Sequence, residues 1–166
     1  MAKGILEQIS RSNGGVPKLA VNGPVALTGT GIDGDRQRNL RYHGGPDKAI
    51  LLISADILDG LRAKGYPVIA GALGENLTVR GLDVRGLRSG QQYRVGDALI
   101  ELTTLRVPCA NLYRYGRQIG EELYDSRCEA GDFTSPCWAH GGFYARVLRG
   151  STLVTGAEVE LVCDVA

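Results

Sequence analysis

Short apolar segments separated by glycine-containing turns are the feature that most constrains the fold of this chain. The 166 residues include 24 glycines, about twice the ordinary frequency, spread without a repeat. Strand-like segments occur along most of the sequence: Gly4–Ser10, Val25–Thr28, Ala49–Ile53, Gln91–Val95, Ala98–Thr104, Phe143–Leu148, Ser151–Thr155 and Glu158–Val162. This spacing, with few helices, predicts a mainly β fold built as a closed or nearly closed β-barrel. The length suits one compact domain covering residues 1–166.

One helix is expected directly after a buried strand. Ala49–Ile53 is a continuous apolar run, which is typical of a strand buried on both faces. Ser54 is a favourable N-cap residue, and Ile57, Leu58 and Leu61 would share one apolar stripe. We therefore expect a helix that begins after Ser54 and packs on the barrel.

The charge balance excludes several classes of partner. Lysine and arginine total 19 and aspartate and glutamate 18, which leaves a formal net charge of +1 at pH 7. This balance does not favour binding to nucleic acid or to a membrane surface. The first residues lack the apolar core of a signal peptide, and no apolar run approaches membrane-spanning length. We expect a cytoplasmic protein.

The cysteines do not follow a zinc-finger pattern. The chain has four of them, Cys109, Cys128, Cys137 and Cys163, without C-x-x-C spacing. A structural zinc site is therefore not expected, and thiols are expected in place of disulfides in a reducing compartment. Cys137, near a His-Gly-Gly motif, is either a second redox thiol or incidental.

The segment Thr104–Leu112 favours a reactive cysteine. Pro108 suits the first position of a helix, and we expect this helix to run from Pro108 towards Tyr124, although the glycines within it would break or shorten it. Cys109 would then lie in the first turn, facing unpaired N–H groups and the positive end of the helix dipole. That field and the charge of Arg106 favour the thiolate. The alternative is a free cysteine buried as a small apolar residue.

A glycine-rich segment, Gly29–Gly34, matches the pattern G-x-G-x-x-G of dinucleotide-binding proteins. The following residues, Asp35–His43, contain a single aliphatic side chain, so the required helix is not predicted and we reject a Rossmann fold. The arginines of this stretch, including Arg36, could bind an oxyanion together with backbone N–H groups. The alternative is a solvated polar loop.

His43–Pro46 and His140–Phe143 both begin with His-Gly-Gly. Paired glycines let a backbone approach a ligand closely, and the adjacent histidine could bind the ligand or play a structural role. A lipase-type oxyanion motif would also require a G-x-S-x-G elbow, and the chain has none, so serine hydrolase chemistry is rejected.

Two further groups of residues have both structural and functional interpretations. Glu75 and Asn76 lie beside a turn, where they could contact a polar ligand or stabilise neighbouring groups. Arg146 shares a strand face with Tyr144 and Leu148, and an arginine on an otherwise apolar face needs a partner such as an anionic ligand.

An ordered set of motifs resembles the MOSC domain, the C-terminal domain of molybdenum cofactor sulfurases. In order they are Gly31–Asp35, His43–Ala49, Gly74–Leu77, Gly96–Asp97, Arg106–Cys109 and Gly142–Val147. The resemblance runs from the first strand to Val162. The ordered set is far more specific than any one of its members.

The resemblance implies a β-barrel with a pocket for the molybdenum cofactor, a pterin that carries a dithiolene and a phosphate. It places the family's cysteine on Cys109, as a molybdenum ligand in an oxidoreductase that reduces N-hydroxylated compounds. A soft thiolate suits a sulfur-coordinated metal. The expected cofactor-binding residues are Lys18, Arg36, His43, Lys48, Glu75, Asn76, Arg106 and Arg146.

Two alternative functions remain open within this resemblance. Cys109 could carry a persulfide in cofactor or metal–sulfur cluster biosynthesis, or the protein could bind or shuttle the pterin without turnover. The chain ends with the barrel, whereas longer bacterial members add a C-terminal extension, so an oxidoreductase of this kind would use a separate electron-donor protein.

Overall fold

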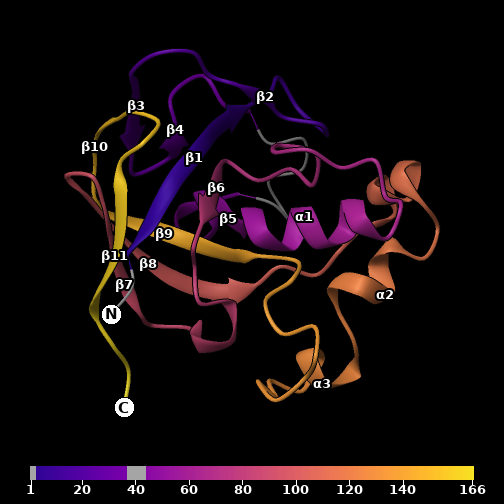
Figure 1. Ribbon diagram of the computed structural model, residues 1–166. Coiled ribbons are helices and arrows are strands. Elements are labelled where there is room, and N and C mark those ends of the chain that lie inside the picture. Colours follow the sequence, from indigo (N-terminus) through magenta and orange to yellow (C-terminus); the bar gives the residue numbers. More distant parts are fainter. Residues whose placement is uncertain (1–2, 37–43) are drawn as a thin grey trace.

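Seven of the described strands form a closed barrel. The computed structural model describes residues 3–36 and 44–166 (Figure 1). The strand order around the barrel is β11-β7-β8-β9-β5-β6-β1, and pairing of β1 with β11 closes it. Their bounds are β1 (Gly4–Arg11), β5 (Ile50–Ser54), β6 (Leu77–Arg80), β7 (Gln92–Val95), β8 (Ala98–Leu105), β9 (Phe143–Arg149) and β11 (Glu158–Cys163). The predicted mainly β barrel is therefore confirmed.

The remaining strands are short. β2 (Leu19–Ala20) pairs with the end of β1, and β10 (Ser151–Leu153), β3 (Val25–Thr28) and β4 (Gly31–Ile32) form a three-stranded sheet. The segment Gly29–Gly34 thus forms the turn of the antiparallel β3–β4 hairpin and includes the whole of β4. An antiparallel hairpin at this glycine-rich segment differs from the parallel strand–helix–strand unit of a Rossmann fold, which agrees with its rejection.

The expected helix after Ser54 is α1 (Ala55–Ala63). The Ser54 hydroxyl accepts hydrogen bonds from the backbone N–H groups of Asp56 and Ile57, which caps the helix. Leu58 and Leu61 are buried. Figure 1 shows α1 lying along the barrel beside β5 and β6. No helix in the described part of the chain is long and apolar enough to cross a membrane.

The predicted helix from Pro108 towards Tyr124 is broken, as its glycines led us to expect, and it does not include Pro108. The chain instead forms a 3-10 helix, η3 (Ala110–Tyr115), and a short helix, α2 (Ile119–Leu123), followed by α3 (Ser126–Glu129). Gly116 separates the first two with φ = 144° and ψ = 137°, a conformation outside the helical region. Two further 3-10 helices, η1 (Pro46–Lys48) and η2 (Val84–Gly86), were not expected from the sequence.

Two apolar cores lie on opposite sides of β5 and β9. Leu52 and Phe143 belong to the core inside the barrel. Leu51 and Tyr144 face outwards, into a second core shared with α1, η3 and α2. Alternate residues of a strand point to opposite faces, so a strand covered on both sides is apolar throughout. This arrangement explains why the first residues of β5 are all apolar. It also places the outward-facing residues of β5 and β9 beside η3.

Candidate functional site

A pocket with a cavity volume of about 70 Å³ lies beside the outer core, partly open to solvent. Its walls come from the loop before β2, the ends of β5 and β9, the loop before β6 and the segment between β8 and η3. The lining residues are Gly15, Val16, Lys18, Arg36, Leu51, Leu73, Gly74, Asn76, Arg106, Cys109, Asn111 and Tyr144. Five residues expected at a cofactor site from the sequence therefore meet in one pocket: Lys18, Arg36, Asn76, Arg106 and Cys109.

Arg106 is a buried cation in the wall of this pocket, with only 3% of its surface exposed. Its guanidinium donates hydrogen bonds to the carbonyl oxygens of Leu73 (2.7 Å) and Gly141 (3.3 Å). Within the described residues its Nε has no hydrogen-bond partner, and no carboxylate lies within ion-pair distance of the guanidinium. Burial lowers the pKa of Arg106, while its interactions with Tyr144, Cys109 and Glu75 oppose this shift. A positive charge in such surroundings favours an anionic neighbour.

Glu75 is fully buried and supports the turn before β6. Its carboxylate accepts hydrogen bonds from the backbone N–H of Leu73 (3.2 Å) and the hydroxyl of Thr78 (3.1 Å). Burial raises the pKa of Glu75, and backbone hydrogen bonds, Thr78 and the charge of Arg106 act against that shift. Glu75 does not line the pocket and holds the backbone that carries Leu73, whose carbonyl in turn binds Arg106. In these contacts Glu75 stabilises neighbouring groups, which was the structural one of its two interpretations.

The second His-Gly-Gly motif forms another part of the support for Arg106. The backbone N–H of Arg106 donates to the carbonyl of Gly142, and the Arg106 side chain binds the carbonyl of Gly141. Gly142 has φ = 94°, and a Cβ at this position would lie 2.6 Å from the carbonyl oxygen of Leu52. Only glycine fits this close approach. His140 lies outside the pocket lining, with its ring Nδ1 3.4 Å from the Glu122 carbonyl oxygen.

Lys18 and Asn76 are joined through a carboxylate that the sequence did not single out, Asp35. Lys18 Nζ lies 2.6 Å from Asp35 Oδ2, and both side chains are more than nine-tenths buried. Asn76 donates from Nδ2 to the same oxygen (2.9 Å) and to the carbonyl of Ser10, and its Oδ1 accepts from the backbone of Leu51. Lys18 and Asn76 thus shape the wall, and the charge of Lys18 is balanced within the protein.

Replacing Asp35 with alanine is expected to destabilise the fold by about 3–5 kcal/mol, because the ammonium group of Lys18 would stay buried without its carboxylate. Urea denaturation of the parent and the variant measures this loss. Asp33→Ala is the matched control, since Asp33 is an exposed aspartate two residues away. A loss below about 1 kcal/mol for Asp35→Ala would mean that Lys18 gains solvent or another partner.

Cys109 lies directly before η3 in an extended conformation, half-buried at the pocket. The predicted position in the first turn of a longer helix is therefore wrong. η3 is a six-residue 3-10 helix, and the Cys109 side chain makes no capping hydrogen bond with it. A helix of this length supplies little dipole field. The side chains of Cys109 and Arg106 interact electrostatically.

Accessibility separates the four cysteines into two pairs. Cys109 is half-buried and Cys163 exposed, whereas Cys128 and Cys137 are buried. We expect native alkylation near pH 7 to label Cys109 and Cys163 and to leave the buried pair unmodified until denaturant is added. Peptide mapping over time measures the four rates. Labelling of Cys128 or Cys137 in the native protein at the rate of Cys163 would contradict this separation.

Besides Glu75, three predicted site residues do not line this pocket or lie outside the described residues. Lys48 holds its ammonium 5.1 Å from the ring centroid of Tyr144, a pocket-lining residue. Arg146 shares the outer face of β9 with Tyr144 and Leu148, as predicted, but it is exposed and lies 3.4 Å from Glu101 and 3.6 Å from Asp47. The Arg146 guanidinium thus has two surface carboxylates as neighbours, and Arg146 does not line the pocket. His43 lies outside the described residues.

Family comparison agrees with the resemblance found in the sequence. The profile of the MOSC domain matches residues 39–160, and the chain therefore belongs to the MOSC domain family. It is 30% identical over 149 residues to the uncharacterized protein YflK of Bacillus subtilis (strain 168), covering 89% of this chain and 63% of YflK. It is 34% identical over 102 residues to protein YiiM of Escherichia coli (strain K12), covering 58% of this chain and 45% of YiiM. The chain thus spans less than two thirds of either relative.

A solved structure shares the fold. The crystal structure of YiiM from Geobacillus stearothermophilus superposes with a TM-score of 0.69 at 27% identity, over 96% of this chain and 75% of that protein. The superposition thus takes in nearly all of this chain.

Proposed function

We propose that this protein binds the molybdenum cofactor in the pocket beside β5 and β9 and reduces N-hydroxylated compounds there. One observation carries the proposal: a half-buried thiol, Cys109, lines the same pocket as a buried guanidinium, Arg106, that no described carboxylate pairs. The first is a soft metal ligand and the second a fixed positive charge suited to an anionic cofactor. Membership of the MOSC family supports the choice of cofactor.

The chemistry of the lining fits this cofactor. Val16, Leu51, Leu73 and Tyr144 supply apolar wall area for a flat ring system, and most of a ligand pocket is normally apolar. Arg36 lines the pocket and is exposed to solvent, so it would contact the phosphate at the solvent-facing side of the pocket. Asn111 adds an amide to the lining. The residues present therefore offer a soft donor, cationic groups and apolar walls together.

Each group would have a distinct task with the cofactor bound. The cofactor supplies a metal centre that exchanges two electrons with a substrate. Cys109 would hold the metal through its sulfur atom, and Arg106, held in position by the Leu73 and Gly141 carbonyls, would supply a positive charge beside it. The overall reaction, R–NHOH + 2e⁻ + 2H⁺ → R–NH₂ + H₂O, needs two electrons, and a separate electron-donor protein would supply them.

A sulfur-carrier function is the second candidate, and the accessibility of Cys109 favours it. A half-buried thiol can be reached by a donor protein, and a persulfide on Cys109 would lie beside the positive charge of Arg106. The two functions make different predictions about bound metal. A carrier contains sulfane sulfur and does not retain molybdenum, whereas the proposed oxidoreductase retains both molybdenum and pterin.

The test is to purify the protein from a host that makes the cofactor and to measure molybdenum and pterin in the same sample. The proposal predicts near-stoichiometric amounts of both, with pterin detected as its fluorescent oxidation product. Sulfane sulfur on Cys109 without molybdenum would establish the carrier function. Pterin and molybdenum without any reductase activity would indicate a binding or shuttle protein.

Arg36→Ala is expected to weaken cofactor binding by about 1.5–3 kcal/mol, which is the range for losing a hydrogen bond to a charged group. Arg146→Ala is the matched control, because Arg146 is an exposed arginine whose neighbours are Asp47 and Glu101. Cofactor retention after gel filtration and the dissociation rate compare the two variants. Equal retention in both would show that Arg36 does not contact the cofactor.

A further inference from the structure

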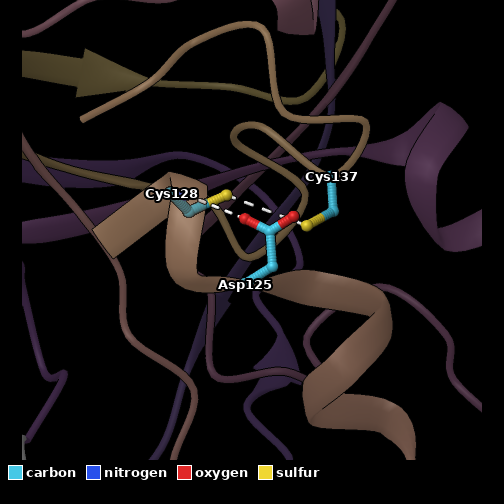
Figure 2. A group of neighbouring side chains, drawn as sticks. All are labelled: Asp125, Cys128 and Cys137. Carbon is cyan, nitrogen blue, oxygen red and sulfur yellow. Dashed lines mark hydrogen bonds between the residues drawn. The ribbon is translucent and has the colours of Figure 1, made fainter. Parts of the chain in front are cut away.

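Asp125, Cys128 and Cys137 form a compact cluster of potential metal ligands on the segment between β8 and β9 (Figure 2). Their ligand atoms all lie within 4.8 Å of one another. The two sulfur atoms are 3.7 Å apart, and both cysteines are buried, at 3% and 8% exposure. Figure 2 shows the Asp125 carboxylate pointing towards both sulfur atoms. The cysteine spacing did not predict this cluster, because the two thiols meet through the fold and not through a C-x-x-C turn.

The local structure explains how the three residues meet. Asp125 is the N-cap of α3, and its Oδ1 accepts a hydrogen bond from the backbone N–H of Cys128 (2.8 Å). Ser135 donates from its hydroxyl to Asp125 Oδ2 (2.8 Å) and accepts from the backbone N–H of Cys137 (3.2 Å). The Ser135 Oγ also lies 3.4 Å from each sulfur atom. A fully buried hydroxyl therefore stands beside all three groups.

We propose that Asp125, Cys128 and Cys137 bind a zinc ion, with the Ser135 hydroxyl or a water molecule as the fourth ligand. Zinc is bound tetrahedrally in proteins by thiolates and carboxylates, with Zn–S distances of about 2.3 Å. Two such bonds at a tetrahedral angle place the sulfur atoms roughly 3.8 Å apart. The observed 3.7 Å matches this separation without movement. A disulfide would instead require the sulfur atoms to approach to about 2.05 Å.

Binding is an exchange of the cation for protons. Zn²⁺ replaces the two thiol protons, which leave to solvent, and no electrons are transferred. Burial raises the pKa of the Cys137 thiol to about 11, so this thiol carries a proton that the cation displaces. Asp125 brings one negative charge from the half-buried side of the cluster. The two buried sulfur atoms would thus bind the ion from the interior of the protein. The ion would enter from the half-buried side, where Asp125 lies.

The cluster adjoins the support of the candidate cofactor pocket. Cys137 is followed by Trp138, whose indole N–H donates to the carbonyl of Leu87 inside the molecule, and then by Gly141, which binds Arg106. An ion that joins α3 to Cys137 would fix the start of the chain segment that runs from Cys137 to Gly141. The role assigned to the ion is therefore structural, and the proposal does not depend on the function of Cys109.

The test uses the whole, reduced protein and two metal ions alone, Zn²⁺ and Co²⁺. Co²⁺ should give intense thiolate-to-cobalt charge-transfer absorption and tetrahedral visible bands at one equivalent, and one equivalent of Zn²⁺ should abolish both. Cys109→Ser and Cys163→Ser are matched single-cysteine controls and should leave the bands unchanged. Cys128→Ser and Cys137→Ser should each lose them. Asp125→Asn, which can still accept the helix-capping hydrogen bond, should weaken Zn²⁺ binding by more than the roughly tenfold loss typical of changes beyond the ligands.

A second measurement on the unmodified protein covers the case in which the serine variants do not fold. Native mass spectrometry should show one zinc ion with the loss of two protons, and bound zinc should protect two thiols from alkylation in mild denaturant. The proposal is contradicted if cobalt bands are absent, if they disappear in Cys109→Ser or Cys163→Ser, or if the two cysteines are found as free thiols or as a disulfide at saturating Zn²⁺.

Discussion

Replacing Gly71 with alanine is expected to cost more than about 4 kcal/mol of stability, which is exceptional for one methyl group. Gly71 has φ = 89°, and a Cβ there would lie 2.1 Å from the carbonyl oxygen of Lys18. The carbonyl of Gly71 also accepts a hydrogen bond from the backbone N–H of Lys18, so the two segments cannot separate freely. The variant should unfold at much lower urea concentration and lose the pocket wall that contains Lys18.

Gly65→Ala is the matched control for this prediction. Gly65 has a similar φ of 96°, but a Cβ there would meet no atom within 4 Å. This variant should therefore lose only the roughly 1–2 kcal/mol that a left-handed conformation costs a residue with a Cβ. If both variants lost the same stability, backbone conformation alone would explain the loss. The close approach of Gly71 to Lys18 would then contribute nothing to it.

Cys109→Ser is expected to lower the reduction of an N-hydroxylated amidine by more than about a hundredfold. Changes outside the ligands of a metal already cost up to about a hundredfold in affinity or activity, and this substitution removes a ligand itself. Serine preserves the size of the side chain, so the fold and pterin binding should be retained. Assays with an artificial electron donor, at equal pterin content, measure the effect.

Cys163→Ser is the control, because Cys163 is exposed at the end of β11 and lies outside the pocket lining. Its activity should equal that of the parent. Substantial activity in Cys109→Ser would remove Cys109 from the metal site. A loss accompanied by missing pterin would instead indicate that Cys109 acts in binding and would leave the reductase step without support.

The sequence predicted the barrel well because its strands carry strong local signals. The apolar run before Ser54 and the hairpin around Gly96 are specified by patterns a few residues long, and both occur as expected. β6 was not predicted, since Leu77–Arg80 is short and pairs in parallel with β5. Such pairing depends on a partner distant in sequence, and no local pattern reports it.

The segment after Pro108 shows where local patterns fail. Helix-compatible residues on both sides of Gly116 predicted a helix that its glycines would break or shorten, but no local pattern reports that the ring of Tyr66 lies 2.9 Å from the position a Cβ would occupy at Gly116. The chain turns at Gly116 and packs Leu112 and Ile119 separately into the outer core. Tertiary packing of this kind overrides helix propensity.

Within the candidate site, the sequence indicated the location of residues better than their roles. Lys18 and Asn76 do line the pocket, but Asp35 binds both, and its place in the quoted motif Gly31–Asp35 was the one available signal. Tyr144 was noted for its strand face and also lines the pocket. Arg146 has the same face in β9, yet it lies beyond the outer core, where surface carboxylates are its neighbours. Residue type and alternation do not determine how far along a strand a pocket extends.

X-ray absorption at the molybdenum edge tests directly whether Cys109 is a ligand of molybdenum. The parent protein and Cys109→Ser, both loaded with cofactor in the same host, would be compared at equal molybdenum content. If Cys109 is a ligand of molybdenum, the metal has one fewer sulfur neighbour in Cys109→Ser, with the two sulfur atoms of the dithiolene unchanged. An identical sulfur coordination number in the two proteins would contradict the assignment of Cys109 as the metal ligand.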